Sequence, residues 1–243
     1  MKATNGRCRR GQLVADLCNA PLEEAALGLR LRQREGVFVL GTRLLCPAEA
    51  AEALRLGGAL TELMPDEPEV FGLLALMLLD DARREARFEG GELVLLGDQD
   101  RSRWDAEQTA RGRVVLDRAF ALQGRGAYVI QAAIASLHME EERDWPQIAA
   151  LYGELSRITG SPVVELSRAV AVAEAEGPEA GLRIADGLDL DGYHYLHATR
   201  AELLRRLGRE REARAALTRA LELAHDEAER RLLERRLADL RPG

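Results

Sequence analysis

Residues 176–184, EGPEAGLRI, and residues 207–217, LGREREARAAL, decide the fold because they carry one pattern twice. Ala180 in the first stretch corresponds to Ala213 in the second, 33 residues later. Each stretch places a glycine near a turn and a small residue where two helices cross, so that antiparallel helices can approach closely. Because such a pair hides its remaining apolar face only against a neighbouring pair, the repeat predicts an array of packed helix pairs.

The second copy fits the period of tetratricopeptide repeats, which is roughly 34 residues. Small and apolar residues occupy the turn, the helix crossing and the inner face, namely Gly208, Ala213, Leu217, Ala220 and Leu223. The other copies are degenerate. We therefore predict an all-α fold, a tetratricopeptide-like helical-repeat array in which antiparallel helix pairs form an α-solenoid.

Residues 48–243 form the helical-repeat domain of this prediction. Apolar residues recur there with a helical period between short breakers. The period and the caps predict helices at about 49–63, 68–88, 105–122, 127–139, 146–158, 162–175, 178–187, 193–207, 210–224 and 226–240. The helix at 68–88 is apolar on almost every side over residues 70–79, so we expect it at the centre of the core.

Residues 1–47 do not join the pattern. We leave them as an N-terminal segment without an assigned fold, either flexible or an aberrant reading. One helix over residues 21–31 and a short strand or buried turn over residues 37–40 are the elements expected within it. The cysteines are odd in number and match no zinc-binding spacing, so we expect reduced thiols. They are Cys8, Cys18 and Cys46.

The composition of the 243 residues excludes several classes of protein. Hydrophobic residues make up 47% and aromatic residues only 4%, with Ala, Leu, Glu and Arg dominant, which favours helices over a β-sandwich. No apolar run reaches the roughly 18 residues of a membrane span, and the first residues do not resemble a secretory signal. We therefore expect a cytoplasmic protein that does not bind membranes. The net charge of −7 argues against a dedicated nucleic-acid binder, because such proteins carry a basic surplus.

Common catalytic motifs are missing from the sequence. It has no Walker-type phosphate loop, no G-x-G-x-x-G after a strand, no G-x-S-x-G elbow and no H-E-x-x-H. We therefore expect a protein that is not an enzyme and holds no cofactor.

Residues 98–104, DQDRSRW, are the least helix-like part of the repeat domain and are called the 98–104 loop below. The loop consists of Asp98, Gln99, Asp100, Arg101, Ser102, Arg103 and Trp104. Its D-x-D-x-S spacing matches the start of a calcium loop, but the required glycine would fall at Arg103 and the bidentate glutamate at Thr109. We expect instead that the two aspartates pair with the loop's arginines and cap the following helix, with Trp104 buried beneath.

Tyr193, His194 and His197 lie in the sequence GYHYLH at the start of a predicted helix. The two histidines are three residues apart and share a helix face, which is a metal-binding spacing. No nearby carboxylate or cysteine completes a ligand set in the sequence. We therefore expect a structural pair, with the tyrosines packed on the previous repeat, at a surface that a partner can contact. We expect His138 at a helix end rather than as a general base.

Paired arginines follow one another along the C-terminal helices. They are Arg205 and Arg206, Arg230 and Arg231, and Arg235 and Arg236. Glutamates are interleaved with them, namely Glu202, Glu210, Glu212, Glu227, Glu229 and Glu234. This pattern is typical of a solvated helix face with many salt bridges, and we favour it over a phosphate-binding stripe.

Several blocks of the chain together resemble one family. The blocks are residues 63–70, 93–96, 98–105, 131–135, 137–138, 144–145, 148–152, 161–164 and 192–194. They are similar to the tetratricopeptide-like C-terminal extension of a group of bacterial extracytoplasmic-function RNA polymerase sigma factors. The resemblance runs from about residue 48 to the C-terminus, and the 98–105 block is its most distinctive part. Gly97 stands where that family has a glutamate, and Ser167 where it has an asparagine.

The resemblance implies a role in transcription initiation. The clamp-binding and helix-turn-helix domains with which such sigma factors begin are not recognisable here, although residues 12–20 are similar to the junction ahead of the extension. We therefore expect a regulatory, protein-binding domain of a sigma factor, whose partner is RNA polymerase core or sigma-factor domains. We expect no sequence-specific DNA binding by this chain alone.

Two other hypotheses stay open at this point. The second hypothesis is a stand-alone tetratricopeptide-like adaptor whose partner lies outside the polymerase. The third hypothesis is an enzyme or ligand-binding protein that uses the 98–104 loop and the region around His194.

Overall fold

The computed structural model of the chain describes residues 31–34, 37–40, 47–89 and 92–240. This part of the chain is all-α apart from two short antiparallel hairpins. Its α-helices are α3 (Pro47–Leu63), α4 (Pro68–Asp81), α5 (Ala106–Ala121), α6 (Ala127–His138), α7 (Trp145–Thr159), α8 (Pro162–Glu176), α9 (Pro178–Asp186), α10 (His194–Arg206), α11 (Glu210–Leu223) and α12 (Glu227–Asp239).

The remaining elements are short. The hairpins pair β1 (Leu31–Arg34) with β2 (Val37–Leu40), and β3 (Phe88–Glu89) with β4 (Glu92–Leu93). Single 3-10 turns lie at η1 (Arg84–Ala86), η2 (Leu96–Asp98) and η3 (Arg101–Arg103). The strand expected over residues 37–40 is thus present as β2, whereas the helix expected over residues 21–31 lies outside the described residues except for Leu31, which begins β1.

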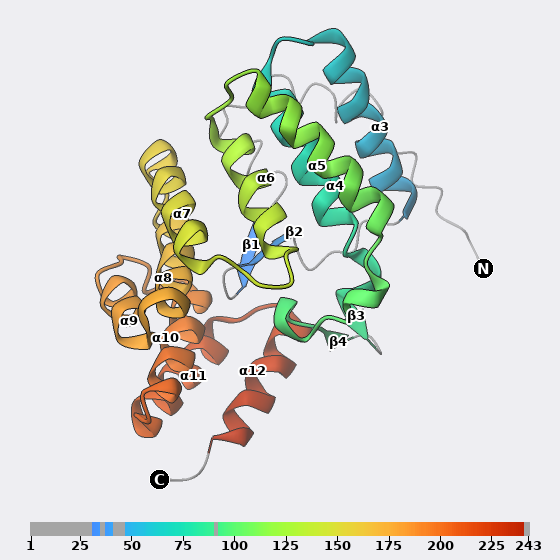
Figure 1. Cartoon of the computed structure of the whole chain (residues 1–243). Helices are drawn as coiled ribbons and strands as arrows, with labels where there is room; N and C mark the ends of the chain where they lie inside the picture. The colour runs from blue at the N-terminus through green and yellow to red at the C-terminus, as the bar shows by residue number, and fades with distance from the viewer. Residues whose placement is uncertain (1–30, 35–36, 41–46, 90–91, 241–243) are drawn as a thin grey trace, which may run out of the picture.

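Helix α4 lies at the centre of the first group of helices, packed against α3, α5 and α6 (Figure 1). Its apolar surface explains this position, because Leu74, Leu76, Leu78 and Leu79 are all buried. The α4–α6 crossing is close. A Cβ at Gly72 would lie 2.6 Å from the backbone nitrogen of Val129, so only glycine fits there.

Helices α7 to α11 pack in chain order, each against the next (Figure 1). The chain reverses direction at Gly160, Gly177 and Gly208, which all have positive φ angles that favour glycine. The aligned residues Ala180 and Ala213 are both buried at helix contacts. Packing between successive antiparallel helices is consistent with a helical repeat.

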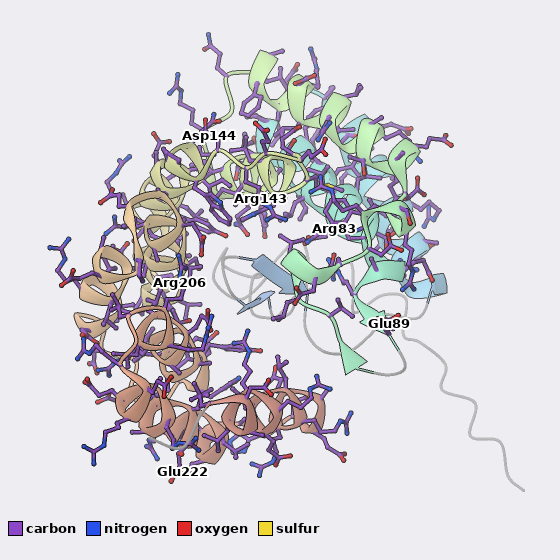
Figure 2. All side chains as sticks on the ribbon, turned by 60° about the horizontal axis from the view of Figure 1, so that its bottom comes forward. Arg83, Glu89, Arg143, Asp144, Arg206 and Glu222 are labelled. Atoms are coloured by element: carbon purple, nitrogen blue, oxygen red, sulfur yellow. The ribbon has the colours of Figure 1, made fainter. Side chains whose placement is uncertain are left out.

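The apolar core follows the same order along the chain. One cluster joins α4, α5 and α6, the next joins α6, α7 and α8, and a third joins α8, α9 and α10. A fourth extends from α8 through α11 to α12, where it includes Leu233 and Leu240. Figure 2 shows that the helices follow an arc, and that α12 runs from its far end towards β3 and β4. The contact between α12 and β4 nearly closes the arc into a ring.

Helix α4 is shorter than expected. We predicted a helix to residue 88, but α4 ends at Asp81 and the chain continues through η1 into β3. The carbonyl of Asp80 explains the end of the helix: it accepts hydrogen bonds from the N–H of Arg83 and from the Arg87 guanidinium, at 3.4 Å and 2.8 Å. The chain therefore turns back on the last turn of α4 instead of extending it.

Within the described ranges, none of the helices combines the length and the apolar character needed to cross a membrane.

Candidate functional site

A cleft of about 520 Å³ lies where the segment around η2 meets the C-terminal helices. We call it the α12 cleft. Its walls come from η2 and the residue before it, from α10 and α11, and from α12. The lining residues are Leu95, Gly97, Asp98, Ala198, Ala201, Glu202, Arg205, Leu217, Arg236, Asp239 and Leu240. A smaller hollow of about 30 Å³ shares Leu95, Ala198 and Arg236 with the cleft and reaches His194, Tyr195 and Leu233.

The two regions singled out in the sequence therefore meet in space. Asp98 of the 98–104 loop lines the α12 cleft, and His194 lines the adjoining hollow. They are brought together because α12 packs between them, contacting β4 on one side and α11 on the other. Sequence reasoning missed the α12 residues of this site, because contacts between such distant segments leave no local pattern.

A fully buried carboxylate connects α12 to α10. Glu229 has no exposed surface, and its Oε1 accepts a hydrogen bond from the hydroxyl of Tyr195. Its Oε2 lies 3.0 Å from Nε2 of His194. The rings of His194 and Tyr195 lie 3.9 Å apart, and Tyr193 packs edge-on against Tyr195 at 5.2 Å. The aromatic side chains at the start of α10 thus surround the buried carboxylate of Glu229.

The burial of Glu229 corrects one expectation. We placed it with the glutamates of a solvated helix face, but its side chain is the most buried on α12. The pattern of alternating Arg and Glu gave no sign of this, since the partners on α10 lie about 34 residues earlier in the chain.

His197 faces a different partner from His194. Its Nε2 lies 2.9 Å from the carbonyl oxygen of Asp191, in the turn before α10. The two histidines lie on the same helix, but their side chains contact different groups, Asp191 for His197 and Glu229 for His194. Among residues 31–34, 37–40, 47–89 and 92–240, no group of three or more His, Cys, Asp or Glu side chains is placed to hold a metal ion.

Hydrogen bonds to the Asp100 side chain shape the 98–104 loop. Asp100 accepts hydrogen bonds from the N–H and the hydroxyl of Ser102, at 2.9 Å and 2.7 Å, and so caps η3. Both bonds lower the pKa of the Asp100 carboxyl, and the bond from the Ser102 hydroxyl has the larger effect. The following helix α5 is capped by Asp105, which accepts from the N–H of Gln108. The expected capping of α5 by Asp98 or Asp100 is therefore wrong.

Arg101 fixes the loop to the end of α6. Its guanidinium donates to the carbonyl oxygens of Met139 and Glu140, the latter at 3.0 Å, and stacks over Trp104 at 4.6 Å. Cations favour such positions because the last carbonyls of a helix lack partners and carry partial negative charge. Trp104 is half-buried against the α4–α6 core, and buried Gln99 donates to the carbonyl of Val94. Arg101 thus binds backbone oxygens rather than the loop's aspartates.

A second buried polar cluster lies at the end of α4. The Asp80 carboxylate contacts Arg83 at 2.5 Å and Arg87 at 3.3 Å, and both Asp80 and Arg83 are almost completely buried. Burial lowers the pKa of Arg87 to about 10, and it raises the pKa of the neighbouring Tyr152 hydroxyl. Figure 2 shows Arg83 on the inner side of the arc, near Arg143. This cluster was not predicted from the sequence.

His138 is the last residue of α6, as expected. It is buried, and its ring packs edge-on against Trp145 at 5.6 Å. Its position in the core between α6 and α7 separates it from the α12 cleft, whose lining does not include it.

Most of the C-terminal arginines pair with glutamates on the surface. Arg205 contacts Glu202 at 2.7 Å, and Arg231 contacts Glu227 at 3.3 Å. Arg206 reaches across to Glu174 on α8 at 2.5 Å. These pairs agree with a solvated, salt-bridged face, with the exception of Glu229 described above.

Part of the chain matches a known family model, and a larger part is similar to a bacterial protein. Residues 40–120 match the model of a family described as a family of unknown function (DUF6596). This match includes the 98–104 loop. A protein of Rhizobium meliloti (strain 1021), described as uncharacterized, is 47% identical over 185 residues, which are 73% of this chain and 44% of that protein. The chain thus spans less than half the length of this relative. No solved structure matches the chain.

Proposed function

We propose that this chain is a tetratricopeptide-like, protein-binding domain of a sigma factor, which regulates transcription initiation by contacting RNA polymerase core or sigma-factor domains. It acts through binding rather than catalysis and does not read promoter DNA itself. The α12 cleft is the observation that carries the proposal. It brings Asp98, the first residue of the most distinctive block of the sigma-factor resemblance, beside the last helices of the array. Helical-repeat proteins bind partners on the surfaces that their stacked helices form.

The chemistry of the α12 cleft fits a protein surface. Apolar Leu95 and Leu217 lie beside the charged Asp98 and Arg236. Protein interfaces combine an apolar centre with a charged rim in this way. Nucleic acids would instead require a surplus of cations, whereas this lining carries carboxylates as well as arginines.

The length of the similar Rhizobium meliloti protein supports the proposal. The matched region makes up less than half of that protein, as expected for one domain of a longer chain. A sigma-factor extension is such a domain, because it follows the parts that bind the polymerase clamp and the promoter.

A binding experiment tests the proposal. The full chain is immobilised, and its binding to bacterial core RNA polymerase and to separate sigma-factor domains is measured by biolayer interferometry. We expect saturable binding to at least one of them. Gly97 lines the cleft and a Cβ there would have no atom within 4 Å, so Gly97→Trp introduces a bulky side chain at the cleft wall. This variant should bind at least about tenfold more weakly.

Gly58→Trp is the matched control. Gly58 lies on α3, outside the cleft lining, and also has open space where a Cβ would stand. It should bind like the unchanged chain. Equal binding by both variants, or the absence of binding to polymerase and sigma domains, would contradict the proposal. Tight, salt-resistant binding of the chain alone to one promoter sequence in a gel shift would contradict it as well.

A further inference from the structure

Helix α12 is attached by few buried side chains. Glu229 and Leu233 are buried within it and Leu240 directly after it, compared with three buried side chains in α11 and six in α10. Buried apolar area supplies most of the free energy that holds a helix in place. Helix α12 is therefore anchored by Leu233, Leu237 and Leu240 in the C-terminal core cluster, together with the polar contacts of Glu229.

These polar contacts select one kind of helix. The Tyr195 hydroxyl and the His194 ring nitrogen both face the two oxygens of one carboxylate, that of Glu229. A buried carboxylate is costly unless such partners meet it, and the partners are costly without the carboxylate. Leu233, four residues after Glu229, enters the apolar hollow beside them. The groove on α10 therefore favours a helix that carries a carboxylate and a leucine one turn apart.

We propose that α12 is a displaceable latch. The groove on α10 that it fills is a docking site for an amphipathic helix of a partner protein, carrying a carboxylate four residues before a leucine. The chain's own α12 occupies the groove until such a helix replaces it. The inference does not rest on the proposed function, because it concerns the groove and its occupant alone.

Displacement of α12 would also change the α12 cleft. Arg236, Asp239 and Leu240 form one wall of that cleft and belong to α12 or follow it directly. When α12 leaves, this wall leaves with it, and the faces of Leu95 and Leu217 become accessible. Binding at the groove and the shape of the cleft are therefore coupled through one helix.

A competition experiment tests the latch in the full chain. A fluorescent peptide with the sequence of residues 225–240 is titrated with the unchanged chain and with the double variant Glu229→Gln, Leu233→Ala. In the unchanged chain the attached α12 competes at high effective concentration, whereas the double variant has a weakened competitor. We expect the peptide to bind the double variant at least about tenfold more tightly, measured by fluorescence anisotropy.

Two controls define the specificity of this binding. Glu227→Gln changes an exposed carboxylate of the same helix, whose side chain is 88% exposed, and should leave peptide binding as in the unchanged chain. A peptide that carries both substitutions itself should bind neither protein. Equal affinity of the original peptide for all three proteins would overturn the proposal. So would dimerisation of the double variant in light scattering without peptide binding, because a second copy would then be the occupant.

Hydrogen exchange on the unchanged chain provides a test that does not depend on any variant. A helix that detaches on its own exchanges its amides through a local opening, ahead of the helices that remain folded. We expect the amides of α12 to exchange at least about tenfold faster than those of α10. Equal protection of the two helices would show that they open together and would overturn the latch.

Discussion

The carboxylate of Glu69 on α4 lies 2.9 Å from the backbone nitrogen of Tyr128, in the first turn of α6. The same carboxylate accepts a second hydrogen bond from the N–H of Val129, at 3.4 Å. A Cβ at Gly126 would lie 2.3 Å from this carboxyl group. Glu69 therefore caps α6 from another helix, and the start of α6 needs glycine to admit it.

Replacing Glu69 with alanine should lower the free energy of unfolding by about 1–2 kcal/mol, because the first N–H groups of α6 lose their acceptor. Urea denaturation followed by circular dichroism measures the change. Glu67→Ala is the control in the same turn. Its carboxylate makes a hydrogen bond of 3.4 Å to the N–H of Glu69, so its loss should cost at most about 0.5 kcal/mol. Equal losses would contradict the capping role.

Replacing Asp80 with alanine should lower the free energy of unfolding by about 3–5 kcal/mol, because Arg83 and Arg87 are left buried without their carboxylate. Thermal or urea unfolding measures this loss. Glu52→Ala removes one partner of an exposed pair with Arg55 and should cost at most about 0.5 kcal/mol. A loss below about 1 kcal/mol for Asp80→Ala would show that water reaches the two arginines.

Two glycine-to-alanine substitutions should change stability in opposite directions. A Cβ at Gly181 would lie 2.4 Å from the carbonyl oxygen of Ala169, so Gly181→Ala must separate α8 and α9, at a cost of about 1–3 kcal/mol. A Cβ at Gly153 on α7 would lie 3.5 Å from the Arg168 side chain, an ordinary contact. Gly153→Ala should therefore stabilise the chain by about 0.5–1 kcal/mol. Melting temperatures of both variants check the signs.

The pair between Glu165 and Arg168 on α8 should make stability depend on acid pH. Hydrogen bonding from Arg168 lowers the pKa of the Glu165 carboxyl in the folded chain. A lowered folded pKa means that the contribution is present above the unfolded value near 4.5 and is lost as the pH falls through the folded value. The part-exposed pair should contribute only about 0.3–0.5 kcal/mol.

The measurement compares Glu165→Gln with the unchanged chain in urea at neutral and strongly acid pH. The variant should be less stable at neutral pH, and the difference should vanish in acid. Glu154→Gln, on the exposed face of α7, serves as the control and should show no such trend. A difference for Glu165→Gln that stays constant with pH would assign the effect to packing rather than charge.

The helices were largely predictable from the sequence because their signals are local. Pro68 and Pro162 begin helices, and Gly208 ends the turn before α11, as their backbone preferences require. The end of α4 was missed, because the deciding bonds run from Arg83 and Arg87 back to Asp80. Apolar periodicity alone does not contain that information.

The candidate site was predictable only in part. The 98–104 loop and His194 stood out by composition, and both regions border the α12 cleft or its adjoining hollow. Their meeting depends on α12, whose sequence of Arg and Glu reads as solvent-facing. Glu229 is buried because His194 and Tyr195 meet it from another helix, a fact that only tertiary structure supplies.

The near-closed arc has a consequence for the order of folding. Contacts among α7 to α11 join neighbours in the chain, so each forms with little loss of loop entropy. The contact between α12 and β4 instead joins segments far apart in the sequence, and it gains nothing until the helices between them are in place. The ring is therefore expected to close last, and nascent chains pass through an open arc before they reach the final shape.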